Sequence, residues 1–144
     1  MHKEPGNPHA TIVADLTLPN TIPSTEFDCI ICTYTLHAVV DFYTMISELH
    51  RILKQEGVLL VAVPHIMLCY PHFHELWRFT PEGLETLLGR VFGVRNVTIK
   101  GYGNSLTSAG ELRGLVARDF SKEELGYHDL RFAMAVMGRA VKTT

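Results

Sequence analysis

The stretch Phe27–Pro64, FDCIICTYTLHAVVDFYTMISELHRILKQEGVLLVAVP, decides the fold of this 144-residue chain. It begins with a continuous apolar run, Cys29-Ile30-Ile31-Cys32, and ends with a second run from Val58 to Val63. Short apolar runs without alternation of polar residues are typical of strands that are buried on both faces of a parallel sheet. We therefore expect two parallel strands here.

The segment between the two runs has the spacing of an amphipathic helix. Its apolar residues recur at Phe42, Met45, Ile46, Leu49, Ile52 and Leu53, with polar residues on the other side. Asp41 is a candidate N-cap and Gly57 a candidate left-handed stop, so we expect a helix over residues 41–54. Strand, helix and strand in this order form a βαβ unit with a right-handed crossover.

The flanking residues extend this pattern in both directions. Upstream, residues 10–14 (ATIVA) predict a short strand that ends at Asp15, followed by a loop that contains two prolines. Downstream, Thr80-Pro81-Glu82 signals a helix start, and the helix should cover residues 81–92 and end at Gly93. We also expect strands over residues 94–100 and 132–141, with Ser108/Glu111 and Ser121/Glu124 as capping boxes of two further helices. The layout is α/β.

Composition narrows the classes of function. The formal net charge is -2 and there is no basic run, which argues against a nucleic-acid surface. No apolar run approaches the ~20 residues of a membrane helix, and the first residues lack the apolar core of a signal peptide. Three cysteines fit a reducing compartment better than a disulfide framework. We expect a cytoplasmic protein with one domain, residues 1–144.

Ligands of α/β sheets bind at the carboxyl ends of the strands. In this sequence those ends fall at Asp15, at Thr33-Tyr34-Thr35 and at Pro64-His65.

At this point the sequence resembles the class I S-adenosylmethionine-dependent methyltransferases, in particular small bacterial-type domains. The residues that carry the resemblance are Ala14-Asp15-Leu16, Phe27-Asp28, Ile30-Ile31, Leu49-His50-Arg51-Ile52-Leu53-Lys54, Gly57 to Val61, Val63-Pro64, Trp77-Arg78-Phe79-Thr80 and the tail from Tyr127 to Lys142. The resemblance implies a partial Rossmann-like sheet, mostly parallel with an antiparallel last strand, and helices on both faces.

The resemblance also assigns roles to the strand ends. Asp15 and Leu16 would contact the adenine of S-adenosylmethionine, and Thr33, Tyr34 and Thr35 would line the sulfonium side. Asp15 can equally be read as a residue that merely ends a strand, and the threonines and tyrosine as an ordinary polar strand end.

Methyl transfer needs a base only if the acceptor must lose a proton, and an imidazole titrates near neutral pH. His37 and His65 follow two strand ends and are the candidate bases, although either can be a plain surface histidine. Tyr70, Trp77 and Arg78 lie in the loop on the acceptor side, where we expect a small molecule or a glycan intermediate. Trp77 can equally be a core residue.

The chain departs from the family at its start. Complete members begin with a strand and a G-x-G-x-G turn that approaches the methionine end of the cofactor, and a second strand then supplies an acid for the ribose. Here Gly6 is the only glycine before Gly57. The chain thus resembles the back half to two-thirds of a methyltransferase domain, an N-terminally truncated one. We expect this isolated chain to be inactive.

Two alternatives remain open. The chain can be a non-catalytic, methyltransferase-like partner protein. The missing first strand would leave a sheet edge unpaired, and either residues 10–14 collapse against this edge or a second copy or a partner chain covers it. A metal module built from His65, Cys69, His72 and His74 is the other alternative, since imidazole and thiolate both suit zinc. Cys29 and Cys32 should point to opposite faces of their strand and are not expected to form a redox pair.

Overall fold

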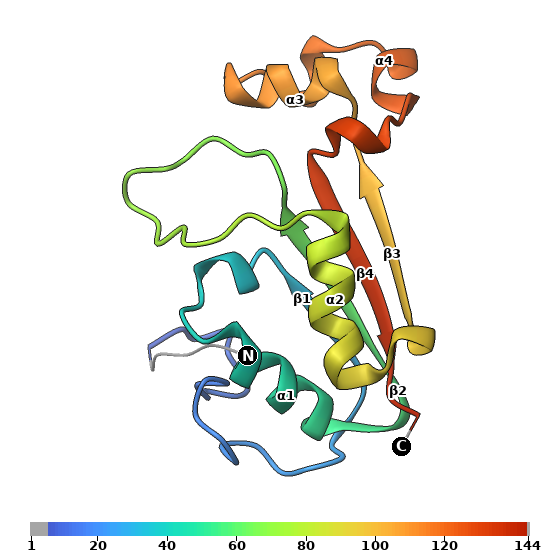
Figure 1. Ribbon diagram of the computed structural model, residues 1–144. Helices are drawn as coiled ribbons and strands as arrows, with labels where there is room; N and C mark the ends of the chain where they lie inside the picture. The colour runs from blue at the N-terminus through green and yellow to red at the C-terminus, as the bar shows by residue number, and fades with distance from the viewer. Residues whose placement is uncertain (1–5, 144) are drawn as a thin grey trace.

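The computed structural model describes residues 6–143 and shows one sheet with helices against it (Figure 1). The strands are β1 (Phe27–Thr33), β2 (Leu53–Pro64), β3 (Val97–Tyr102) and β4 (Ala135–Val141). The α-helices are α1 (Phe42–Ile52), α2 (Pro81–Phe92), α3 (Ser105–Leu112) and α4 (Lys122–Gly126). Four 3-10 turns, η1 (Leu36–Ala38), η2 (Val94–Asn96), η3 (Ala117–Asp119) and η4 (Leu130–Phe132), complete the element order.

The strand order in the sheet is β1-β2-β4-β3. β1 runs parallel to β2, with Ile31 opposite Leu60, whereas β4 is antiparallel to both β2 and β3. Three strands therefore point in one direction and the last strand in the other. This arrangement confirms the expected α/β fold with an antiparallel last strand, and it confirms the parallel pair on either side of α1.

The helix between the parallel strands begins as expected and ends earlier than expected. Asp41 caps α1, its carboxylate accepting a hydrogen bond from the Thr44 backbone N–H at 3.0 Å. Gly57 is not the stop, because the chain turns into β2 directly after Ile52. The left-handed residue is instead Glu56, with φ 61°. Gly57 lies buried inside β2, where a Cβ would come within 2.7 Å of the Lys54 carbonyl oxygen, so close backbone approach explains this glycine.

α2 confirms the signals read from the sequence. Thr80 is its N-cap and accepts a hydrogen bond from the Gly83 N–H at 3.0 Å, and Pro81 is its first residue. Gly93, with φ 83°, follows its last residue. The helix is thus specified almost entirely by its own local sequence.

The hydrophobic core lies between one face of the sheet and the two longest helices. In Figure 1, α1 and α2 lie on the same side of the sheet, while α3 and α4 lie beyond its end. Buried core residues include Ile46, Leu49, Leu84 and Leu88 of the helices and Leu59, Val61, Val63 and Val136 of the sheet. The expectation of helices on both faces is met on one face only: Ile31 is 70% exposed and Met137 45% exposed on the other.

The predicted strand over residues 10–14 does not form. Only Val13 makes an isolated β-bridge, and the surrounding residues are irregular. Ile12, Ala14 and Leu16 nevertheless pack against the core in alternation, so the segment keeps the side-chain pattern of a strand without a ladder of hydrogen bonds. β1 is an edge strand of the described sheet, as expected. That a second copy or a partner chain covers this edge stays a prediction.

The last part of the chain departs from the prediction in its boundaries. Residues 94–96 form the turn η2, and α3 is capped by Asn104 rather than Ser108. Ser108 is buried and its hydroxyl donates to the Phe132 carbonyl oxygen at 2.9 Å. The Ser121/Glu124 capping box of α4 is confirmed. The final strand begins at Ala135, after the turn η4.

Cys29 is exposed and Cys32 buried, and neither forms a disulfide. None of the helices within residues 6–143 is long and apolar enough to cross a membrane.

Candidate functional site

A cavity of about 460 Å³ opens beside the carboxyl end of β1. Its walls are residues 14–17, residues 30–32, Thr35, residues 38–41, Met45 and Leu49. We call it the β1 cavity. It brings together Asp15, Leu16 and Thr35, three of the five residues that the sequence predicts for cofactor binding. Thr33 and Tyr34, the other two, do not line it.

Asp15 forms a tight turn at the mouth of the β1 cavity. Its Oδ1 accepts hydrogen bonds from the Thr17 N–H at 2.9 Å and from the Thr17 hydroxyl at 2.6 Å. The Asp15 carbonyl oxygen also accepts from the Leu18 N–H at 3.0 Å. These bonds fix the direction of the carboxylate, and they place Leu16 in the cavity wall.

An ion pair on α1 holds residues 20–24, the segment that follows the Asp15 turn. The buried Glu48 carboxylate receives the Arg51 guanidinium at 2.7 Å and the Asn20 N–H at 3.0 Å. Arg51 also donates to the Ile22 carbonyl oxygen at 2.6 Å and to the Ser24 hydroxyl at 2.7 Å. The pair thereby ties residues 20–24 to α1. The sequence analysis placed both residues on the polar side of the helix and did not predict the ion pair. Their i, i+3 spacing is the signal that could have indicated it.

Tyr34 leaves β1 in a left-handed conformation, with φ 48°. Its N–H still donates to the Ala62 carbonyl oxygen of β2 at 2.8 Å, so the conformation is held by the sheet. Such a φ is costly for a bulky side chain and marks a position that the surrounding structure constrains. The Tyr34 ring meets the His37 ring edge to face, with 6.1 Å between centroids.

The two predicted bases lie after neighbouring parallel strands and differ in their surroundings. His37 is 7% exposed, and within residues 6–143 its Nδ1 has no hydrogen-bond partner. Burial lowers the pKa of His37, which favours the neutral imidazole. His65 is half-buried, and its Nδ1 lies 3.1 Å from the Phe79 carbonyl oxygen. Because a carbonyl only accepts, the proton of the neutral ring is on Nδ1 and the lone pair on Nε2.

The loop of residues 65–79 is tied to the exit of β1 near its C-terminal end. The N–H groups of Leu76 and Trp77 both donate to the His37 carbonyl oxygen, at 2.8 and 3.0 Å. Trp77 Nε1–H donates to the Val39 carbonyl oxygen at 2.9 Å. Arg78 forms an ion pair with Glu75, and this hydrogen-bonded partner lowers the pKa of Glu75. Arg78 is therefore already engaged within the loop.

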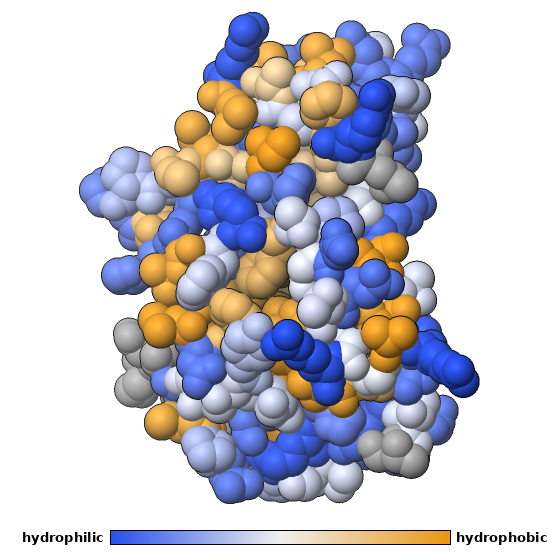
Figure 2. Space-filling view, in the orientation of Figure 1, coloured by the Kyte–Doolittle hydropathy of each residue, from blue (hydrophilic) through white to orange (hydrophobic). Residues whose placement is uncertain are grey.

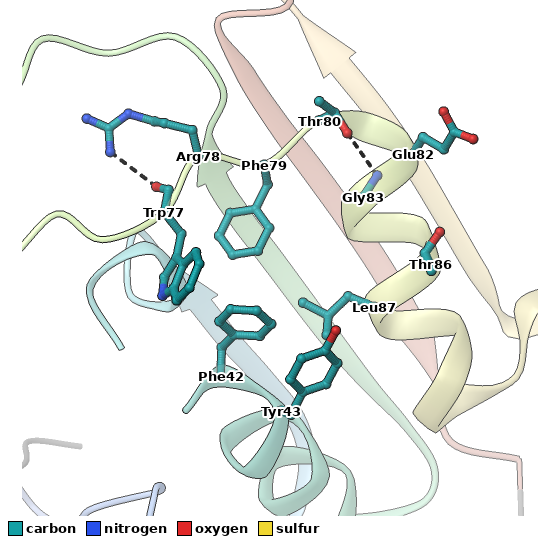
Figure 3. A pocket seen from close by; sticks show the side chains of 10 residues that line it. All are labelled: Phe42, Tyr43, Trp77, Arg78, Phe79, Thr80, Glu82, Gly83, Thr86 and Leu87. Carbon is teal, nitrogen blue, oxygen red and sulfur yellow. Dashed lines mark hydrogen bonds between the residues drawn. The ribbon is translucent and has the colours of Figure 1, made fainter. Parts of the chain in front are cut away.

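A second cavity of about 550 Å³ lies between the starts of α1 and α2, under residues 77–80 (Figure 3). We call it the helix cavity. Aromatic rings wall it: the Phe42 ring meets Trp77 at 5.2 Å and Phe79 at 5.7 Å between centroids. Trp77 and Arg78 line it, but Tyr70 does not. The structure therefore gathers two of the three residues that we predicted for the acceptor, and it leaves Tyr70 apart, beside Phe73.

Apolar side chains also reach the surface at the α3 end of the molecule (Figure 2). Leu106, Leu112 and Leu115 are exposed there. This surface lies beyond the carboxyl ends of β2 and β3 and the amino end of β4 in Figure 1.

The metal alternative finds no support in the described structure. Among residues 6–143, no three His, Cys, Asp or Glu side chains gather closely enough to hold a metal ion. His72 and His74 are exposed in the loop, and Cys69 Sγ instead lies 3.6 Å from an Arg78 nitrogen.

Comparison with known proteins agrees with this fold. Residues 2–61 match a family model described as a methyltransferase domain. No curated protein matches the chain. A methyltransferase from Thermotoga maritima has the same fold at a TM-score of 0.60 and 17% identity, over 91% of this chain and 63% of that one.

Two other solved structures share the fold. An S-adenosylmethionine-dependent methyltransferase from Archaeoglobus fulgidus has a TM-score of 0.58 and 14% identity, over 91% of this chain and 66% of that one. A Haemonchus contortus phosphoethanolamine N-methyltransferase, in complex with S-adenosylhomocysteine, has a TM-score of 0.58 and 15% identity, over 92% of this chain. This chain covers 37% of that protein. The chain therefore spans less than two thirds of the length of each of these three structures.

Proposed function

We propose, from the premise that this chain has the fold of the class I S-adenosylmethionine-dependent methyltransferases, that it supplies the adenine side and the acceptor side of a methyl-transfer site. The single observation that carries this proposal is the β1 cavity. There Asp15 and Leu16, from an N-terminal turn, meet Thr35, from the exit of β1. The carboxyl edge of a parallel pair is where such sheets bind ligands.

The cavity suits the nucleoside part of S-adenosylmethionine. Its volume of about 460 Å³ lies within the usual range of small-molecule sites. Apolar side chains such as Leu16, Val39 and Met45 suit the faces of a planar base, and the Asp15 carboxylate is an acceptor suited to an exocyclic amino group. We assign the adenine to this cavity.

The sequence offers fewer residues that could bind the methionine end and the ribose of the cofactor. Its methionine end carries an ammonium and a carboxylate, and its ribose carries two hydroxyls. Residues 7–56 contain no glycine for a close backbone approach to the methionine end. We therefore propose that these groups are held by residues outside this sequence, on a longer chain or a partner, and that the 144 residues alone do not transfer methyl groups.

The chemistry that the bound cofactor would supply is a methyl group activated by the adjacent sulfonium. The chain's own part is to position the acceptor and exclude water. His65 and His37 would serve as bases for a hydroxyl or amine acceptor. His65 has its lone pair on Nε2, whereas His37 is covered by the loop at Leu76 and Trp77. We propose His65 as the first candidate, and a small molecule or glycan intermediate as the acceptor.

Titration of the ¹⁵N-labelled chain with adenosine tests the nucleoside assignment. We expect amide shifts at Leu16, Thr35 and Val39, with millimolar affinity. Ala38 lines the cavity and is exposed, so Ala38→Phe should fill the cavity and abolish these shifts. Ala109→Phe, on the exposed side of α3, is the matched control and should leave them unchanged. If adenosine shifts no amide of the cavity, the assignment is wrong and the non-catalytic partner becomes the better reading.

A further inference from the structure

Trp77 makes contacts with both cavities. Its ring lines the helix cavity, and its Nε1–H donates to the carbonyl oxygen of Val39, which lines the β1 cavity. We propose that Trp77 is a positioning residue that couples the acceptor-side loop to the nucleoside pocket, an inference that rests on the proposed function. In this role Trp77 acts through Val39 and His37 and does not itself touch the nucleoside.

The first support is the set of bonds that Trp77 makes to the exit of β1. Its backbone N–H donates to the His37 carbonyl oxygen at 3.0 Å, and its indole N–H donates to the Val39 carbonyl oxygen at 2.9 Å. One residue thus fixes two positions of the segment that follows β1. One of these is a candidate base and the other is a wall of the β1 cavity.

The second support is the direction of the indole. Phe42, the first residue of α1, meets the ring edge to face on one side (Figure 3). The indole N–H donates to the Val39 carbonyl oxygen. Trp77 is 41% exposed, which is more than a residue with only a core role requires. Its donor is already used inside the chain, so it is not free to bind an acceptor molecule. These facts favour positioning over direct contact with the substrate.

The geometry has a consequence for ligand binding. Val39 lines the β1 cavity and its carbonyl oxygen accepts the indole hydrogen bond, so a base that seats against Val39 should change the bond to Trp77. The loop of residues 65–79 is attached to the same indole. Adenosine bound in the β1 cavity should therefore change the position of the loop that carries Tyr70 and Arg78.

The experiment uses the fact that Trp77 is the only tryptophan of the chain. A ¹⁵N spectrum then contains one indole cross-peak, which reports on the bond to Val39. We expect adenosine to shift this peak with the same dissociation constant as the Leu16 and Thr35 amides. Trp77→Phe keeps an aromatic ring and removes the N–H, and it should weaken adenosine binding about fivefold, which corresponds to about 1 kcal/mol at 1.4 kcal/mol per decade.

Phe92→Leu is the matched variant, because it removes a buried ring that lines neither cavity and leaves the Trp77 N–H in place. It should lower the melting temperature about as much as Trp77→Phe and change adenosine affinity less than twofold. If adenosine shifts Leu16 and Thr35 but leaves the indole peak and the Trp77→Phe affinity unchanged, the coupling is wrong and the proposed function stands. Equal weakening by both variants would also overturn it, since affinity would then follow stability. If adenosine shifts no amide of the β1 cavity, the coupling and the proposed function are both wrong.

Discussion

At the scale of the residue, Tyr34 stores backbone strain directly after β1. A left-handed φ costs a residue with a Cβ about 1 kcal/mol or more relative to glycine. We expect Tyr34→Gly to have a higher free energy of unfolding than Tyr34→Ala by about that amount, although both lose the ring. Urea denaturation measures the difference. The same pair at Thr33, which lies within β1, should show the opposite order, and a higher stability for Tyr34→Ala would contradict the strain.

Glu48 makes the free energy of unfolding depend on pH. The hydrogen bond from Arg51 is the largest cause that lowers the pKa of Glu48 below its usual value. A carboxyl whose folded-state pKa is depressed contributes stability that is complete above its unfolded pKa, about 4.3. That contribution is lost as the pH falls through the folded-state pKa. We expect the unfolding free energy to fall less steeply below about pH 5 in Glu48→Gln than in the parent chain.

The matched control for this prediction is Glu85→Gln. Glu85 is exposed on α2, and within residues 6–143 it forms no ion pair. Urea denaturation from pH 7 to pH 3 should give this variant the slope of the parent chain. Equal slopes for Glu48→Gln and the parent chain would show that the ion pair with Arg51 does not contribute to the loss of stability at low pH.

At the scale of the element, β1 presents different surfaces to its two sides. Ile31 is 70% exposed on the face away from the helices, whereas Ile30 packs against the core. Ile31→Lys should change the unfolding free energy by less than about 0.5 kcal/mol and reduce the binding of apolar dyes. Ile30→Lys should destabilise by about 1 kcal/mol or more, because Ile30 is half-buried against the core and its apolar contacts would be lost. Similar destabilisation by both variants would show that the second face is covered.

An element could be predicted where the residues that define it are neighbours in the sequence, and not where they are distant. α2 was predicted to the residue because Thr80, Pro81 and Gly93 are local signals. The strand over residues 10–14 failed because a ladder needs a partner strand, which the local pattern does not specify. α3 starts at the Asn104 cap rather than at Ser108, since Ser108 bonds to Phe132 across the fold.

The site shows the same division. Thr35 could be predicted because it follows the end of β1, whereas Asp15 and Leu16 were assigned from the family resemblance and lie in a turn rather than at a strand end. The contacts that hold this site join distant residues: Arg51 to Ile22, and Trp77 to Val39. No local period or cap indicates such pairs, so the contacts that shape the β1 cavity could not be predicted from the sequence.

At the scale of the whole molecule, the central claim is that the chain holds the nucleoside half of its cofactor and not the methionine half. A hydrogen bond to a charged group contributes about 1.5–3 kcal/mol, and each 1.4 kcal/mol is about tenfold in affinity. Loss of two such contacts therefore moves a micromolar site to about the millimolar range.

The most direct test is isothermal titration calorimetry of the purified 144-residue chain with S-adenosylhomocysteine and, separately, with adenosine. We predict millimolar dissociation constants that agree within about threefold, because only the shared nucleoside makes contacts. Micromolar binding of S-adenosylhomocysteine together with millimolar binding of adenosine would contradict the claim, because this chain would then hold the methionine end itself.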